Sequence, residues 1–533
     1  MGYEANIGSI QALEKQIEEG RGDIIKLKRT RNSFLNISTR VPPEILAYIF
    51  VWCIFREPGR SLNSPHFDGL RRGSYNFLLV CHHWFKVASS TPELWSFWGN
   101  TVEDWKECHH RSGVAPLDLI LCGEYNDDNT LDGPLREALR RRVMQNTIRQ
   151  VHLMTGDRDA LISIVALLTP DDEGGQNENI ESIILVNERF APVDVLLFFT
   201  SSLSRLHLLI LGGNFWISSW DRLTSRTTLL TAMDLDFSGS SPSPTPTTSQ
   251  LFSILASNPN IQELRLSDSA LPDDAHGSTL KVPLRNLKML SLSGEFRHLF
   301  ELLHRLVLPQ ALDEMHLCGS NPTLEDISQT FAPYIRDYFQ RDIRFQDKLE
   351  IFSFSSLGFI SIRVGVVRAQ ATAPAPWASF MVGLSATAPL NVPERFLVRL
   401  IAPFPREPVV SFDATLDFEL PEELLLTMPN IETLRIRGVK LSKGFLQPDP
   451  DGPHAGMKLL PSLRSLSLKT IYLDDGNWGD LTTYLGHQTS DGQIISLRMS
   501  GNLPYIPSEV VDEIKGLVGE FVHEPGTRGE LLV

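Results

Sequence analysis

Cysteine is scarce in this chain, and no two cysteines have the spacing of a metal-binding pair. The 533 residues include five cysteines, Cys53, Cys81, Cys108, Cys122 and Cys318. An odd number without paired spacing argues against the disulfide framework that holds many small secreted domains together. We therefore expect reduced thiols and a cytoplasmic or nuclear location, or both.

Positive charge and long apolar runs are also in short supply. Lys and Arg together number 49 against 64 for Asp and Glu, which gives a net charge of -15. Such a balance argues against a nucleic-acid footprint over the whole surface. Apolar runs such as LHLLIL at 206–211 are far too short to cross a bilayer, and the first residues lack the apolar core of a signal peptide. We predict a soluble protein with neither nucleic acid nor membrane as a partner.

The motifs of the common enzyme classes are missing as well. The sequence has no Gly-rich dinucleotide or phosphate loop, no His-Glu-x-x-His and no Gly-x-Ser-x-Gly. The triplet CHH occurs at 81–83 and at 108–110, but adjacent histidines on a helix point about 100° apart and do not easily chelate one ion. We expect Cys81 on an apolar stripe with exposed histidines beside it, and we expect no catalysis, no cofactor and no metal.

What the sequence does contain begins with an amphipathic helical segment at 1–37. Its apolar residues recur at steps of three, four and seven, the period of one helical stripe; they are Ile10, Leu13, Ile17, Ile24, Leu27 and Phe34. Gly20 and Gly22 interrupt the stripe, and Asp23 is a good N-cap for a second helix. We predict a short helical hairpin that packs on the next domain, with a dimerising coiled coil as the alternative.

From residue 148 onward one pattern recurs, in which an apolar anchor is followed at the third and fifth positions by further apolar residues. Ten copies occur, with anchors at Ile148, Ile180, Leu203, Ile261, Leu287, Leu312, Leu349, Ile431, Leu463 and Ile494. The alternation that ends each copy is the period of a short strand, and several copies follow a helical pattern that closes at a proline. Leu230 begins a weaker copy, and we expect the other long gap, before Ile431, to hide a further one.

The pattern predicts a repeating helix, turn and strand with a period of roughly 25 to 32 residues. Its spacing resembles that of leucine-rich repeats, without the usual ladder of Asn or Cys. The resemblance implies an irregular α/β solenoid whose strands form a parallel sheet. Within each strand, the residue between the two apolar ones should point away from the core.

Between 38 and 98 the sequence favours three short amphipathic helices. Pro42 and Pro43 suit a first helical turn, and Ile45, Leu46, Ile49 and Phe50 follow on one stripe. A second helix is predicted over 77–88, and a third begins with Thr91 as N-cap and Pro92 at its first position. A unit this small buries too little surface to be stable alone, so it should lean on a neighbour or a partner.

The succession Pro-Pro-Glu-Ile-Leu, Ile-Phe, Leu-Val-Cys-x-x-Trp and Thr-Pro-x-Leu-Trp resembles the F-box of fungal F-box proteins that continue into leucine-rich-like repeats. An insert at 56–74 is longer than in a compact F-box. The resemblance implies docking to the Skp adaptor of a cullin-RING (SCF-type) ubiquitin ligase, with the cullin scaffold as a further partner. By match to the motif, the adaptor-facing surface or its direct support comprises Pro42, Ile45, Leu46, Ile49, Phe50, Val80, Cys81 and Trp84.

The resemblance thus implies a substrate receptor of the ligase, which performs no chemistry itself and holds an unknown protein substrate on its repeats. The alternative is an interaction scaffold with an F-box-like fold that acts outside ubiquitination. In the late repeats the outward strand positions form a locally basic stripe. Because Arg matches carboxylate and phosphate geometry, one hypothesis is that this face binds an acidic or phosphorylated segment, and the alternative is that these are ordinary solvated strand residues. The candidate residues are Arg265, His316, Arg435, Arg437, Lys469 and Arg498.

The fold class expected from these patterns is α/β, with an N-terminal all-helical F-box unit followed by the irregular solenoid. The boundaries that they suggest are 1–37 for the helical segment, 38–98 for the F-box-like domain, 99–147 for a linker or helical cap, 148–510 for the repeats and 511–533 for a C-terminal cap or tail.

Overall fold

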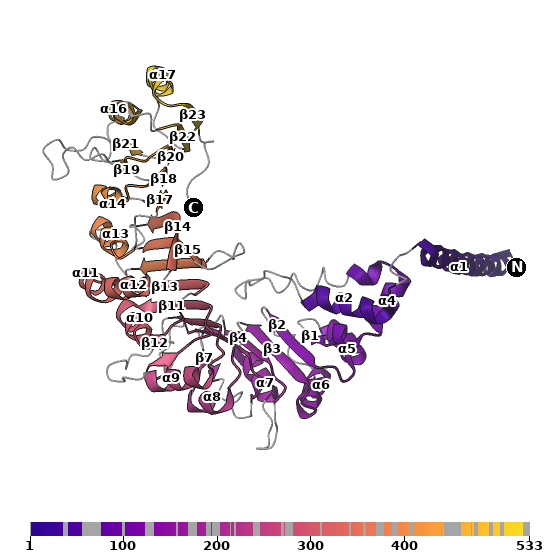
Figure 1. Cartoon of the computed structure of the whole chain (residues 1–533). Helices are drawn as coiled ribbons and strands as arrows, with labels where there is room; N and C mark the ends of the chain where they lie inside the picture. The colour runs from indigo at the N-terminus through magenta and orange to yellow at the C-terminus, as the bar shows by residue number, and fades with distance from the viewer. Residues whose placement is uncertain are drawn as a thin grey trace. The chain divides into compact units, whose positions relative to one another are not determined.

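The computed structural model is a mixed α/β protein that divides into two compact units, Met1–Leu206 and His207–Val533 (Figure 1). The residues that the structure describes are 2–35, 41–55, 76–98, 102–122, 133–155, 158–168, 178–187, 193–194, 203–213, 215–217, 220–237, 246–267, 271, 281–309, 312–339, 343–354, 359–368, 378–385, 393–404, 409–416, 418, 420–438, 440–441, 460–470, 472–473, 478–489, 494–501 and 506–525.

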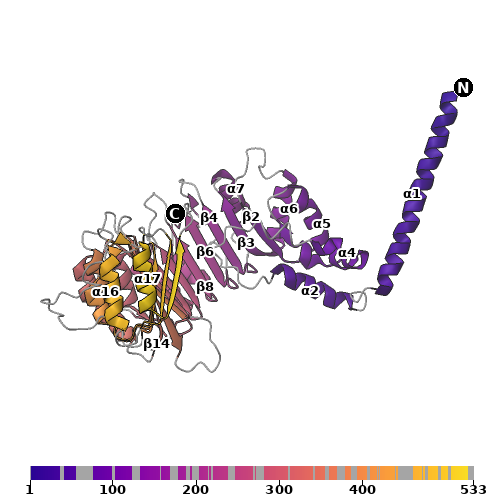
Figure 2. The same cartoon turned by 90° about the horizontal axis from the view of Figure 1, so that it is seen from above.

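The N-terminal segment is one helix, α1 (Gly2–Leu35), which runs straight through Gly20 and Gly22 (Figure 2). The predicted hairpin is therefore wrong. Each glycine costs roughly 1 kcal/mol in a helix interior, but two such costs are small beside the backbone hydrogen bonds of a helix this long. A glycine also does not force a turn unless the chain turns there for another reason.

A helical module follows α1, formed by α2 (Pro43–Phe55), the 3-10 turn η2 (Asn76–Leu79), α4 (His82–Ser89) and the 3-10 turn η3 (Pro92–Trp95). The second predicted helix is wrong in its start, because α4 begins only after Cys81. Thr91 does precede η3, but its hydroxyl donates to the carbonyl of Val87 at 2.8 Å instead of capping the turn. The insert at 56–74 lies outside the described residues.

The rest of the first unit alternates strands with helices. Its elements are β1 (Phe97–Trp98), α5 (Val102–Ser112), β2 (Leu117–Cys122), α6 (Gly133–Met144), β3 (Ile148–Thr155), α7 (Arg158–Leu168), β4 (Ser182–Asn187) and the short β5 (Val193–Asp194). Strands β1, β2, β3 and β4 pair in that order, and all pairs are parallel. The segment 99–147, predicted as a linker or helical cap, thus contributes a central strand.

The second unit continues the alternation over a longer stretch. Its elements are β6 (Leu208–Gly213), β7 (Phe215–Trp216), α8 (Trp220–Arg226), β8 (Ala232–Asp236), α9 (Thr248–Ser257), β9 (Glu263–Ser267), β10 (Val282–Pro283), β11 (Met289–Glu295), α10 (Phe296–Leu303), β12 (Leu306–Val307), β13 (Glu314–Ser320), α11 (Leu324–Asp326), the π-helical turn η7 (Ile327–Phe331), α12 (Ala332–Phe339), β14 (Ile343–Phe354), β15 (Phe359–Arg368), β16 (Ala378–Ser385), α13 (Pro393–Ile401), β17 (Ser411–Thr415), α14 (Glu422–Leu426), β18 (Thr433–Arg437), β19 (Lys440–Leu441), β20 (Ser465–Lys469), β21 (Tyr472–Leu473), α16 (Trp478–Thr489), β22 (Ser496–Gly501), α17 (Ser508–Leu517) and β23 (Glu520–Pro525).

The long strands of this unit form one mostly parallel sheet, with its helices along one side (Figure 1). The order along the sheet is β6, β8, β9, β11, β13, β16, β15, β14, β17, β18, β20, β22 and β23. Strand β15 is antiparallel to both of its neighbours, so β14, β15 and β16 make a meander inserted with reversed order between β13 and β17. The parallel array is therefore interrupted where the repeat pattern is weakest.

Most predicted copies end in a strand, and their apolar residues stack across the sheet. Met233, Leu264, Leu290 and Met315 form one such column in the described register, and all four are buried. Phe412 of β17 pairs with Leu434, which identifies the weak copy hidden before Ile431. It escapes a search for large apolar residues because Ala414 fills its second core position.

Two copies are out of register. Leu209 of β6 pairs with Met233, so the anchor of that copy is Leu206 rather than Leu203. Likewise Leu349 of β14 pairs with Phe412, so it holds the first strand position and is not the anchor. Extra apolar residues allow the first copy to be read three residues too early and the second to be read three residues too late.

Candidate protein-docking surfaces

The helical module has a small core of its own. Leu46 and Phe50 of α2 are buried, and the ring of Phe50 lies 5.0 Å from the ring of the half-buried Trp84 on α4. Trp95 of η3 is also buried, and its indole N–H donates to the carbonyl of Ala88 at 2.8 Å. These contacts fix α2, α4 and η3 to one another.

The opposite side of α2 is apolar but exposed to solvent. Ile45, Tyr48, Ile49 and Trp52 occupy positions i, i+3, i+4 and i+7 of the helix, with exposed fractions of 52%, 68%, 42% and 45%. We call these four residues the α2 face. A helix with apolar side chains on all sides is normally covered on all sides, and an exposed patch of this kind usually marks an interaction site.

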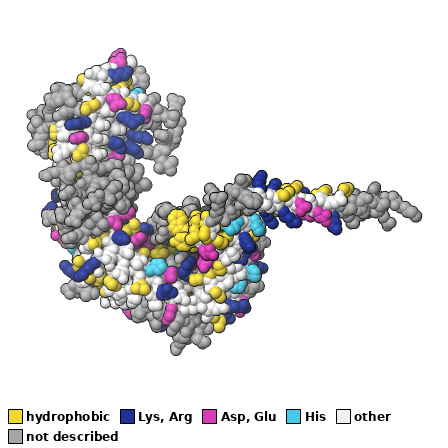
Figure 3. Space-filling view, turned by 45° about the vertical axis from the view of Figure 1, so that its right-hand side comes forward, with side chains coloured by type: hydrophobic (Ala, Val, Ile, Leu, Met, Phe, Trp, Pro, Cys, Tyr) yellow, Lys and Arg dark blue, Asp and Glu magenta, His cyan; other side chains and the backbone are white. Residues whose placement is uncertain are grey.

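Neighbouring elements of the module add exposed apolar side chains. Leu79 and Val80, which lie at the end of η2, are 84% and 54% exposed, and Phe85 of α4 is 44% exposed. The guanidinium of Arg111 lies 5.9 Å from the ring of Phe85 and 4.4 Å from that of Trp95. Hydrophobic side chains gather in one area of the surface in Figure 3, close to several histidines.

The structure divides the eight residues that the motif assigned to the adaptor. Pro42, Ile45, Ile49 and Val80 are exposed, whereas Leu46 and Phe50 are buried. The sequence pattern did not separate the exposed residues from the buried ones. It assigned Ile45 and Leu46 to one stripe, although adjacent residues on a helix point about 100° apart. The spacing of i, i+3, i+4 and i+7, counted from Ile45, would have added Tyr48 and Trp52 to the same side of the helix.

Cys81 has another role than predicted. Its backbone is extended, and its Sγ accepts a hydrogen bond from the backbone N–H of Trp84 at 3.5 Å, so Cys81 is the N-cap of α4 rather than part of its apolar stripe. His82 beside it is exposed, as predicted, whereas His83 is half-buried. Within the described part of the chain, no group of three or more side chains is arranged as a metal site.

The helical module is attached to the first sheet through β1. The N–H of Asp118 on β2 donates to the carbonyl of Ser96 at 2.7 Å, just before Trp98 pairs with Leu119. Trp98 is buried, with His109 edge-on at 5.3 Å and the guanidinium of Arg142 at 5.8 Å. The sequence-based expectation that this small module leans on a neighbour is confirmed by these contacts.

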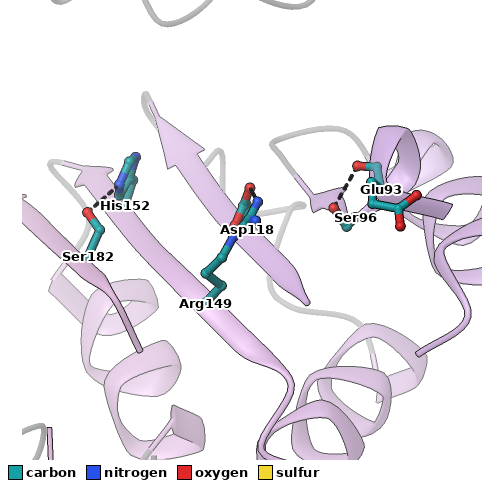
Figure 4. A network of polar contacts seen from close by, with 6 residues as sticks. All are labelled: Glu93, Ser96, Asp118, Arg149, His152 and Ser182. Atoms are coloured by element: carbon teal, nitrogen blue, oxygen red, sulfur yellow. Dashed lines mark hydrogen bonds and ion pairs between the residues drawn. The ribbon is translucent and has the colours of Figure 1, made fainter. Parts of the chain in front are cut away.

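A charged pair joins the neighbouring strands β2 and β3 (Figure 4). Arg149 donates to both carboxylate oxygens of Asp118, at 2.9 and 2.6 Å. Burial raises the pKa of Asp118, and the hydrogen bonds and charge of Arg149 oppose that rise. A two-point ion pair of this kind favours the observed alignment of β2 and β3, since removal of Arg149 would leave the buried carboxylate of Asp118 without compensation.

His152 of β3 is buried and lies 3.0 Å from the hydroxyl of Ser182 on β4. Burial lowers its pKa to about 4, against about 6.5 for an exposed histidine. Between these two values the unfolded chain binds a proton that the folded chain does not, so the free energy of unfolding falls as the pH drops. The whole contribution is about 3 kcal/mol and is complete below pH 4.

We therefore expect His152→Gln to remove a pH dependence of stability. The urea concentration at the unfolding midpoint should fall further between pH 7 and pH 5 for the wild-type protein than for the variant, because glutamine keeps a polar contact with Ser182 and does not titrate. Circular dichroism during urea unfolding at both pH values measures the difference. The exposed His82, changed to Gln, is the matched control, and equal slopes in all three proteins would contradict the assignment.

Among the outward positions on the strands of the second unit, Arg265 of β9 lies beside an acidic residue of β8. Arg265 lies 3.8 Å from the carboxylate of Asp234, and its guanidinium contacts the sulfur of Met289 at 3.1 Å. Burial raises the pKa of Asp234 to about 6, although Arg265 opposes this shift. Arg265 is thus partly buried and already engaged, which makes it a weaker ligand residue than its sequence position suggested. His316 is half-buried on β13, aligned with Ser291.

The later strands carry the basic residues in two adjacent columns. Arg435 aligns with Ser467 and Arg498, and Arg437 aligns with Lys469. Arg435 and Arg437 are exposed, whereas Arg498 donates to the carboxylate of Glu524 on β23 at 2.7 Å. We call Arg435, Arg437 and Lys469 the basic strand face. The sequence correctly placed these three residues together, but it did not show that Glu524 neutralises Arg498.

Comparison of the chain with protein-family models gives no match, and comparison with curated proteins gives none either. Among the described residues, no helix combines the length and the apolar character that crossing a bilayer requires.

Proposed function

We propose that this protein is a non-catalytic substrate-recognition subunit of an SCF-type cullin-RING ubiquitin ligase, in which the helical module docks to the Skp adaptor. The α2 face is the observation that carries the proposal. It exposes four large apolar side chains on a helix whose other side is already packed. The described part of the chain leaves this face open, and a partner would cover it. The resemblance of the surrounding motif to the F-box supplies the identity of that partner.

In this proposal the second unit is a leucine-rich-repeat-like solenoid that holds the substrate. Parallel strands linked by helices, with apolar columns stacked from β8 to β13 and from β17 to β22, support such an architecture. The protein would act by position: it would keep substrate lysines near a charged ubiquitin-conjugating enzyme and so make their attack effectively intramolecular. The cullin scaffold would join through the adaptor.

Co-expression with the Skp adaptor tests the proposal. We expect the two chains to co-purify through size-exclusion chromatography, and we expect addition of the cullin and RING subunits to produce a larger complex that transfers ubiquitin to a captured protein. An adaptor that elutes separately would overturn the proposal. Adaptor binding without ubiquitin transfer to any captured protein would favour the alternative, an interaction scaffold outside ubiquitination.

The basic strand face is proposed to bind an acidic or phosphorylated segment of the substrate. Arg435 and Arg437 present guanidinium groups two residues apart on one strand, with Lys469 on the next. Guanidinium groups match the two oxygens of carboxylates and phosphates, and their clustering in a chain of net charge -15 makes this area electrostatically distinct. Arg265, His316 and Arg498 would lie outside the main contact.

Reversal of charge at Arg435 and Arg437, both to Glu, should weaken binding of acidic phosphopeptides at least tenfold, because each charge-assisted hydrogen bond contributes about 1.5–3 kcal/mol. Fluorescence anisotropy with a phosphopeptide pool, before and after phosphatase treatment, measures this. Arg140→Glu with Arg141→Glu, on the exposed side of α6, changes the net charge equally and is the control. Equal losses in both double variants would point to net charge alone.

A further inference from the structure

The apolar stripe of α1 has no partner among the described residues. Leu13, Ile17, Ile24 and Leu27 are 58%, 56%, 54% and 70% exposed. They belong to a single helix of 34 residues, long enough for more than four heptads. The hairpin that would have covered them does not form. A stripe of this length, exposed to water on a charged helix, needs a second helix to bury it.

The order of residue types along the stripe indicates which type of coiled coil α1 favours. When Ile10 is placed at heptad position a, Ile17 and Ile24 also fall at a, and Leu13 and Leu27 fall at d. Isoleucine at a with leucine at d favours a parallel coiled coil of two helices over higher oligomers. Arg31 falls at a fourth a position, and a single charged residue there specifies register and a low oligomer state at some cost in stability.

The flanking charges agree with two parallel copies of the same helix. In a parallel pair, position g of one helix faces position e of the next heptad in its partner. Asp23 is at g and Lys28 at the following e, so two copies would form this opposite-charge pair twice; Gln16 faces Arg21 in the same way. Both Asp23 and Lys28 are exposed in α1, within reach of an approaching helix.

Gly20 occupies the remaining d position between Leu13 and Leu27. A Cβ built at Gly20 meets nothing within 4 Å, so a larger side chain fits the single helix without strain. In a paired helix the same glycine leaves a gap in the seam. Such a gap should weaken the pairing, so a larger side chain at position 20 should strengthen association.

We propose that α1 pairs with α1 of a second copy of this chain in a parallel two-stranded coiled coil. The inference goes beyond the proposed ligase function and does not depend on it. Its consequence is bivalence: each assembly presents two α2 faces and two basic strand faces, so that a partner with two binding segments is held by avidity rather than by one contact.

Sedimentation equilibrium of the full chain, without any adaptor, tests the pairing. We expect wild-type protein to reach twice the 59.8 kDa of one copy at micromolar concentration. Ile24→Glu should weaken the dimer at least a hundredfold, and Gly20→Leu should tighten it about tenfold. Ile25, which is 48% exposed one residue off the seam, gives the matched control Ile25→Glu, which should leave the dimer unchanged.

Leu27→Cys, at a d position, tests the orientation. In a parallel pair the two introduced cysteines face each other and form an interchain disulfide under mild oxidation, whereas the wild-type chain treated in the same way controls for its own five cysteines. Monomeric wild-type and Gly20→Leu proteins would overturn the proposal, as would equal effects of Ile24→Glu and Ile25→Glu. A dimer without the Leu27→Cys crosslink would overturn the parallel arrangement, and binding of α1 to lipid vesicles in place of self-association would assign the stripe to a membrane surface.

Discussion

Ile49→Glu is expected to weaken binding of the Skp adaptor at least thirtyfold while the helical module stays folded. Ile49 is near the middle of the α2 face and is 42% exposed, so the change adds a charge to the surface without opening the core. A central apolar contact in an interface is commonly worth 2 kcal/mol or more, and a carboxylate in its place must be desolvated without a partner. Isothermal titration calorimetry with purified adaptor measures the loss.

The matched control is Ile162→Glu on α7. Ile162 is also an isoleucine on a helix surface, with 40% exposure, but it lies outside the helical module. The Ile162→Glu protein should bind the adaptor as the wild-type chain does. Equal affinities of the Ile49→Glu and wild-type proteins would show that the α2 face is not the docking surface, even where the adaptor itself binds. Leu46 and Phe50 are poor choices for such an experiment because their burial confounds binding with folding.

Trp98→Ala should produce the largest loss of stability among the changes considered, about 3–5 kcal/mol. Trp98 of β1 is 1% exposed, and its ring packs against the ring of His109 and the guanidinium of Arg142. Alanine would leave a cavity at the place where the helical module joins the first sheet. Urea unfolding followed by circular dichroism should show an earlier transition, and limited proteolysis should release the helical module.

A second tryptophan provides the comparison. Trp52 is 45% exposed on the α2 face, so Trp52→Ala should change stability by less than about 1 kcal/mol while it weakens adaptor binding. The two tryptophans thus separate attachment of the module from its proposed function. An unchanged urea midpoint for Trp98→Ala would contradict the packing described here.

The alternating apolar pattern allowed several strands of the second unit, among them β9, to be predicted from sequence. Leu264 and Leu266 are buried with Arg265 between them facing outward, as a period of two requires. A local pattern does not show which strands become neighbours. The order of β14, β15 and β16 depends on pairings between segments far apart in the chain, and no local pattern encodes it.

For the candidate sites, too, one part could be predicted from sequence and another part was decided by the tertiary structure. Residue types and spacing gave the position of α2 and the outward residues of the basic strand face, because both follow from periods of 3.6 and 2 along one element. Only the tertiary structure decided that Phe50 packs against Trp84 while Ile49 meets solvent, and that Glu524 holds Arg498. The sequence by itself determined which faces exist. Burial and ion pairing depend on what lies opposite each face, and the neighbours that decide this come from distant parts of the chain.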